Sequence, residues 1–190
     1  SAGRAGRSPR RAAGEMGGMR KRPCVNIDQL VATEIGERLP GAPDKYRGAA
    51  IAPISALIGA ERLGYNLTVV PPGKSAFPFH NHYGNEEMFF ILEGEGELRY
   101  GEQRHPLRAG DVIACPPGDA ASAHQISNTS ADSTLRYLAV STMQSPDRFH
   151  YPDSGKTGAS HYLDRDRLGF PDAIRIRNRA ADNLDYWHGE

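Results

Sequence analysis

The 190-residue sequence has only two cysteines, one tryptophan and no long apolar run. Cys24 and Cys115 lie far apart in unrelated contexts, which leaves room for one disulfide but favours reduced thiols. No apolar stretch is long enough to span a bilayer, and no apolar segment of a signal peptide follows the basic N-terminus. We therefore expect a cytoplasmic protein with no membrane partner.

The sequence also lacks net charge, but this zero is a cancellation between two regions. Residues 1–22 hold seven basic residues and one acid, whereas the rest of the chain holds 16 basic and 22 acidic residues. The basic leader has two interpretations, a nucleic-acid or membrane arm and a disordered tail, and its lack of aromatic side chains favours the tail. Because the remaining chain is negative, we expect no nucleic-acid partner. The leader contains Met16 and Met19, and the sequence from Met19 resembles a natural start, so the first 15 or 18 residues are expected to be an early start or an expression remnant.

Glycine (21 residues) and proline (14 residues) are frequent, which is typical of many short strands joined by turns. Residues 23–45 are expected to form an arm, and residues 46–60 form either a strand and loop or a short helix. Helical periodicity is absent from the middle of the chain, so its closely spaced strands predict an antiparallel sandwich or barrel. The expected strands are 65–70, 87–93, a hairpin centred on 100–102, 111–118, 123–130, 134–142, 147–151 and 174–177.

Two histidines separated by one residue, His80 and His82, form the main candidate site. Alternate residues of a strand point to the same face, so both imidazoles are expected to share a face. Tyr83-Gly84-Asn85 supplies a turn, after which Glu86 and Glu87 open an apolar strand and face opposite ways. One of these carboxylates returns to the imidazoles across the hairpin, and His124 is a fourth candidate. Such a set suits one divalent first-row transition metal.

These residues resemble the two sequence motifs of the cupins, which are small jelly-roll barrels with a metal inside. The first motif reads Gly73, His80, His82, Glu87 and Gly94, and the position of Gly94 selects Glu87 over Glu86. The second motif reads Gly110, Pro116, Gly118, His124 and Asn128. The sequence departs from the family at two points: Gly73 to His80 is one residue longer than usual, and Gly118 to His124 is three residues longer.

The resemblance implies an all-β cupin jelly-roll (double-stranded β-helix) barrel with an N-terminal arm and a C-terminal extension. We expect residues 1–22 to be the leader, 23–151 the barrel with its arm, and 152–190 an extension packed on the barrel. Residues 151–160 are expected to form a loop, and in the extension the aromatic pair Tyr186 and Trp187 is expected to dock. The resemblance is closest to single-domain bacterial cupins described loosely as sugar-phosphate-isomerase-like, and it implies a homodimer.

The resemblance implies that His80, His82, Glu87 and His124 bind the metal, which is Zn, Mn, Fe, Ni or Co. An octahedral ion with four protein ligands keeps two positions for water or substrate, whereas a tetrahedral zinc would be closed. Two functions remain open: a metal-dependent isomerase-like enzyme or dioxygenase acting on a small molecule, and a non-catalytic, metal-anchored binding or sensor protein. An inward-facing arginine among Arg99, Arg104 and Arg136 would favour an anionic substrate. Arg175, Arg177 and Arg179 are expected to form a solvated face.

Overall fold

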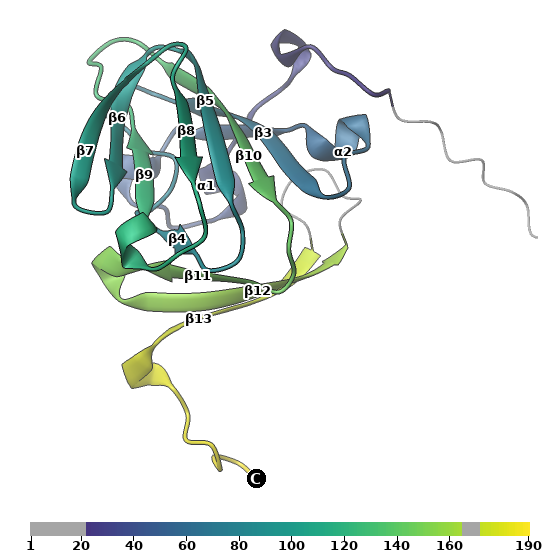
Figure 1. Ribbon diagram of the computed structural model, residues 1–190, viewed down its shortest axis with the longest axis vertical. Coiled ribbons are helices and arrows are strands. Elements are labelled where there is room, and N and C mark those ends of the chain that lie inside the picture. Colours follow the sequence, from purple (N-terminus) through teal and green to yellow (C-terminus); the bar gives the residue numbers. More distant parts are fainter. Residues whose placement is uncertain (1–21, 165–171) are drawn as a thin grey trace, which may run out of the picture.

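The computed structural model describes residues 22–164 and 172–190, and nearly all of its regular structure is antiparallel β-sheet (Figure 1). The largest sheet has six strands, which run in the order β1 (Thr33–Glu34), β2 (Ala50–Pro53), β3 (Leu63–Val70), β10 (Leu135–Thr142), β5 (Glu87–Glu93) and β8 (Val112–Cys115). A second sheet consists of β7 (Gln103–Arg108), β6 (Glu95–Tyr100) and β9 (His124–Ser127). The third consists of β13 (Asp172–Arg179), β12 (Lys156–Asp164), β11 (Asp147–Tyr151) and β4 (Asn81–His82).

Helices are short and lie at the margins of the sheets. The α-helices are α1 (Ile35–Arg38) and α2 (Ser55–Ile58). The 3-10 turns are η1 (Ile27–Gln29), η2 (Asp44–Tyr46), η3 (Ala120–Ser122), η4 (Pro152–Ser154) and η5 (Ala180–Asp182). No helix in the described ranges is long and apolar enough to cross a membrane.

The core lies between the six-stranded sheet and the strands that face it. Phe89 and Ile91 on β5 and Tyr137 on β10 alternate with less buried neighbours, so one face of each strand points inward. The inward face belongs to a single cluster of buried side chains that also includes Val70, Leu98, Leu107, Ile113, Ile126 and Leu135. Burying this surface provides the main favourable term for folding.

Glycines of the two motifs allow the chain to turn between strands. Gly94 joins β5 to β6 at a φ of 85°, and Gly110 precedes β8 at a φ of 95°. A side chain is strained in this left-handed region, and at Gly94 a Cβ would also overlap the carbonyl oxygen of Thr134. These glycines therefore fix the positions at which the motif strands begin and end.

The structure confirms the all-β jelly-roll fold and most of the expected strands. Residues 46–60 contain both of the alternatives, the strand β2 and the short helix α2. The prediction of a loop over residues 151–160 is wrong beyond η4, because β12 begins at Lys156 and pairs with both β11 and β13. Its small and polar residues resemble a loop in sequence, but neighbours on both sides satisfy its backbone.

The leader is outside the described residues, apart from Arg22. The expected boundary after residue 151 coincides with the turn between β11 and β12, and the division into units stays a prediction. The chain leaves the sheet after β13, and η5 and the residues after it project from the body (Figure 1). The prediction that the terminal aromatic pair docks is wrong, because Tyr186 and Trp187 are 86% and 75% exposed. Their rings pack on each other with centroids 4.7 Å apart.

Candidate metal centre

The strand that carries the His-x-His pair is held in place by a glycine of the second motif. Gly118 donates its amide to the carbonyl of His82 over 2.9 Å. Asn81, fully buried between the two histidines, donates its side-chain amide to the Gly118 carbonyl over 2.7 Å. Because Asn81 points away from its neighbours, His80 and His82 both face the barrel, as the spacing predicts.

The fourth candidate approaches from the opposite strand. His80 and His124 form an antiparallel bridge with backbone hydrogen bonds of 3.2 and 2.8 Å. This bridge joins the segment before β4 to β9, so side chains 44 positions apart lie together. His124 is only 3% exposed. The three extra residues of the second motif form η3, which lets the chain return to His124 at the expected depth.

One carboxylate oxygen lies at the centre of the three imidazoles. Glu87 Oε2 is 3.8 Å from His80 Nε2, 3.3 Å from His82 Nε2 and 2.9 Å from His124 Nε2. Ligand atoms of His80, Glu87 and His124 all lie within 4.8 Å of one another. Glu86 is exposed. The structure thus brings together all four residues singled out in the sequence.

The outer nitrogen of each imidazole meets an oxygen acceptor. His80 Nδ1 is 2.8 Å from the Pro78 carbonyl, His82 Nδ1 is 2.9 Å from Asp147 Oδ2, and His124 Nδ1 is 3.3 Å from the Ser122 carbonyl. An Nδ1–H donor facing each acceptor leaves the Nε2 lone pair directed at the centre. Three imidazole nitrogens and a carboxylate that converge on one point form a donor set that fits a divalent metal.

The electrostatics describe how the cluster is balanced in the absence of metal. Burial lowers the pKa of His80 to about 4, despite the Glu87 carboxylate beside it. Burial acts in the same direction on His82, but hydrogen bonds to Asp147 and Glu87 outweigh it and raise the pKa of His82 to about 10. Burial would raise the pKa of Glu87, yet His124 and His82 hold it well below its usual range. A proton on His82 therefore compensates the carboxylate, and a metal cation would displace it.

Aromatic rings close the cluster on two sides. Tyr151 stacks on His80 with ring centroids 6.0 Å apart, and Phe149 lies 6.4 Å from His82. The side chains of His80, His82 and Glu87 are 16%, 16% and 18% exposed, so the ligands are mostly shielded from solvent. Two hollows of about 420 and 440 Å³ lie away from these ligands, one on the β11–β13 sheet and one against β6, β7 and β8.

The three arginines that could have supplied an inward cation have other partners. Arg99 lies over the Phe79 ring at 3.6 Å and pairs with Asp153 over 2.8 Å, while Arg104 pairs with Glu97. Arg136 pairs with Glu93 over 3.0 Å. Cys115 is buried, and burial, with a contribution from Glu87, raises the pKa of its thiol to about 12. Cys24 and Cys115 are both free.

Sequence reasoning missed two residues that orient the ligands, Asp147 and Tyr151. Both are on β11, which pairs with β4 so that Phe149 stands opposite His82. An acid 65 positions from its histidine gives no local signal, and only the pairing of the two strands reveals it. The alternation of Asp147, Phe149 and Tyr151 along a predicted strand was the available indication that they share a face.

Comparisons with known proteins agree with this geometry. Residues 66–141 match the family model described as "Cupin domain", and this segment contains all four candidate ligands. This match identifies residues 66–141 as similar to a cupin domain, and the jelly-roll fold agrees with it.

A curated relative, an oxalate-binding protein from Thermotoga maritima, is 38% identical over 71 residues, which are 37% of this chain and 54% of that protein. The chain spans about half the length of the curated relatives it matches. Among solved structures, a sugar phosphate isomerase of the cupin superfamily from Silicibacter pomeroyi has a TM-score of 0.66 at 20% identity, covering 86% of this chain and 98% of that one. A predicted oxalate decarboxylase from Thermotoga maritima has a TM-score of 0.50 at 25% identity, covering 64% and 99%.

Proposed function

We propose that this chain is a metal-dependent cupin that binds and transforms a small, oxygen-rich molecule at one divalent transition-metal ion held by His80, His82, Glu87 and His124. The observation that carries this proposal is the orientation of the three imidazoles, whose Nδ1 atoms all meet oxygen acceptors while their Nε2 atoms converge on Glu87. Isolated core histidines have no reason to share this arrangement.

The bound ion would polarise a substrate carbonyl or hydroxyl and lower the pKa of a bound water. The chain's own contribution is to orient and to exclude water. Asp147 orients the ring of His82 by accepting a hydrogen bond from His82 Nδ1. The rings of Phe149 and Tyr151 cover the ligands from the β11 side. The low exposure of the ligand side chains favours a small molecule, or one end of a larger one, as the substrate. These features fit an isomerase-like reaction, and iron in the site would favour a dioxygenase.

The first test is the metal content of protein purified without chelator, measured by mass spectrometry of the elements. We expect about one transition-metal ion per chain in the wild type and almost none in Glu87→Gln, because the carboxylate contacts all three imidazoles. Glu86→Gln is the matched control, since that carboxylate is exposed at the preceding position. Wild-type protein that lacks stoichiometric metal, or a Glu87→Gln variant that retains it, would contradict the proposal.

A second candidate function is metal-anchored binding without catalysis. It is favoured by the curated relative described as oxalate-binding and by Asp147, the acid beside the cluster, being already bonded to His82. A substrate screen separates the two candidates: turnover that disappears in a folded His82→Ala variant supports an enzyme. Binding of small acids without turnover supports the alternative. The homodimer, the cytoplasmic location and the absence of a nucleic-acid partner stay predictions.

A further inference from the structure

Two rows of side chains run from the metal centre across the third sheet. His82 pairs with Phe149, Phe149 with Gly158, and Gly158 with Arg177. In the next row, Tyr151 pairs with Lys156. Residues directly opposite each other in antiparallel strands project from the same face. Arg177 and Lys156 therefore lie on the face of the sheet that carries His82.

Each of these cations contacts an aromatic ring that in turn packs on a candidate ligand. Arg177 Cζ is 5.3 Å from the centre of the Phe149 ring, and that ring packs against His82. Lys156 Nζ is 5.1 Å from the centre of the Tyr151 ring, which stacks on His80. Both cations are thus one aromatic ring away from the metal centre.

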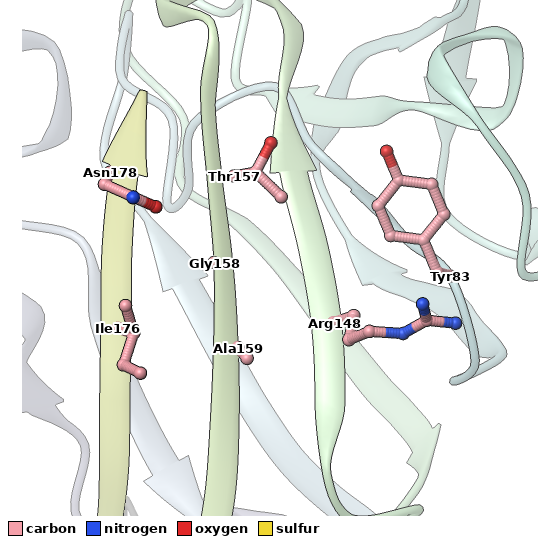
Figure 2. Close-up of a pocket in the computed structure, with 7 residues that line it drawn as sticks. All are labelled: Tyr83, Arg148, Thr157, Gly158, Ala159, Ile176 and Asn178. Atoms are coloured by element: carbon pink, nitrogen blue, oxygen red, sulfur yellow. The ribbon is translucent and has the colours of Figure 1, made fainter. Parts of the chain in front are cut away.

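The opposite face of the same sheet has a different character. Ile176 and Asn178, the neighbours of Arg177 in the chain, point into a hollow of about 420 Å³ that Tyr83 and Arg148 also line (Figure 2). Alternation along β13 therefore directs Arg177 away from this hollow and toward the metal-centre side. The expected solvated face is confirmed, since Arg175, Arg177 and Arg179 are all exposed, and this face adjoins the metal centre.

The charge on this face is not compensated by nearby acids. Within the described ranges, no carboxylate forms an ion pair with Lys156 or Arg177. Asp153, the acid in the turn between β11 and β12, is already bonded to Arg99 over 2.8 Å. Arg179, opposite Lys156 on β13, donates its Nε to the carbonyl of Ser154 over 3.2 Å. Two cations beside an enclosed site, with no anion of their own, are a binding surface for the anion of a ligand.

We propose that Lys156 and Arg177 form an anion subsite that binds a phosphate or carboxylate at the far end of the substrate. This inference rests on the proposed function, because the near end of the substrate reaches the metal centre. A ring separates each cation from the ligands, so a two-carbon dianion with adjacent carboxylates is too short to engage both. The substrate class is a small sugar acid, sugar phosphate or hydroxy acid with its anion several bonds from its metal-binding oxygens.

The test compares three acids by titration calorimetry on the metal-loaded protein. Glycerate carries only the metal-binding end, 3-phosphoglycerate adds a phosphate, and malate has a carboxylate in place of it. We expect at least one of the two longer acids to bind at least about tenfold more tightly than glycerate, since charge-assisted contacts are strong. A preference for 3-phosphoglycerate identifies phosphate as the bound anion, and a preference for malate identifies carboxylate.

The variants Lys156→Met and Arg177→Met are expected to lose most of this preference while retaining metal content and affinity for glycerate. The chain supplies matched controls that make the same kind of contact elsewhere. Lys45 lies over Tyr46 at 5.0 Å, and Arg148 lies over Tyr83 at 5.7 Å on the opposite face of the sheet. Lys45→Met and Arg148→Met are expected to leave the preference unchanged.

Several outcomes would overturn the subsite. These are a wild type that does not prefer either longer acid, subsite variants that keep the preference, or control variants that lose it equally. Metal content is measured on the same preparations. Loaded protein without a preference contradicts the subsite alone, whereas protein that takes up no metal contradicts the proposed function and the subsite with it.

Discussion

The region around the candidate ligands and the C-terminal strands both consist of antiparallel sheet, but they differ in how their side chains are buried and bonded. Around Glu87, the Nδ1 atom of each imidazole faces an oxygen acceptor, and His124 is almost completely buried. On β13 and beyond, large apolar side chains such as Ile176 and Trp187 are exposed. The first region holds a fixed geometry, and the second presents side chains that contribute little to the core.

This difference indicates where specificity can change without loss of the metal centre. The ligands are placed by strand pairing and by backbone bonds such as that between Gly118 and His82. The cations Lys156 and Arg177 lie on the hairpin of β12 and β13, and the sequence of β13 can vary because it is the edge strand of its sheet. β11 links the two regions, because it carries Asp147 on the ligand side and pairs with β12 on the other.

The largest expected effect is a loss of metal affinity on substitution of Asp147. This residue on β11 accepts a hydrogen bond from His82, and we expect that bond to support metal binding. In Asp147→Asn the side chain keeps its shape but loses the charge that orients His82 Nδ1–H. Outer partners of this kind typically contribute about 10–100-fold to metal affinity, and we expect a loss in that range. Competition with a chelating indicator measures it.

Asp153→Asn is the control for this change, because Asp153 is an acid two residues past β11 that pairs with Arg99. Its metal affinity is expected to equal that of the wild type. If Asp147→Asn binds metal as tightly as the control, β11 does not support the centre, and the two regions are more independent than the contacts indicate.

Much of the site was predictable because its signals are local or periodic. His80 and His82 share a face by alternation, and Gly94 selects Glu87 over Glu86 through the length of one strand. The strand β5 was predicted to its ends, since its apolar run from Met88 to Leu92 lies between turn residues. The cupin fold followed from these motifs and the spacing of the strands around them.

The parts that were missed depend on contacts between distant segments. The strand β12 contains Gly158 and polar residues, and it is stable as a strand because β11 and β13 flank it. The cation pair was missed for the same reason, since Arg177 alternates with isoleucine as a surface strand would. Docking of Trp187 was predicted from side-chain type alone, and the path of the chain after η5 takes it away from the barrel.

A second prediction tests how closely the hairpin is fitted to the metal centre. At Gly158 a Cβ would overlap the ring of Phe149 and the carbonyl oxygen of Ile176. Gly158→Ala therefore forces the Phe149 ring or the strand to shift, and overpacking of this kind costs about 1–3 kcal/mol of unfolding free energy. Urea denaturation of the metal-free protein measures the loss.

Gly84→Ala is the matched control, since its nearest non-neighbouring atom, Gln144 Oε1, would be 3.8 Å from the new Cβ. Its free energy of unfolding is expected to stay close to that of the wild type. Equal stabilities of the two variants would contradict this prediction. They would mean that β12 can shift at no cost in free energy, and that packing does not hold the Phe149 ring between Arg177 and His82.

The smallest effect is expected at the end of the chain. Trp187 is the only tryptophan, and its main ring contact is with the neighbouring Tyr186. Trp187→Ser should change the free energy of unfolding by less than about 0.5 kcal/mol, because an exposed side chain is not part of a core. The intrinsic fluorescence of the wild type is a second measurement: emission typical of solvated indole, unchanged by metal, is the expected result. Blue-shifted emission that is lost on dilution would contradict this prediction, because it would mean that a second copy of the chain covers Trp187. The contrast between the two regions would then hold only for the isolated chain.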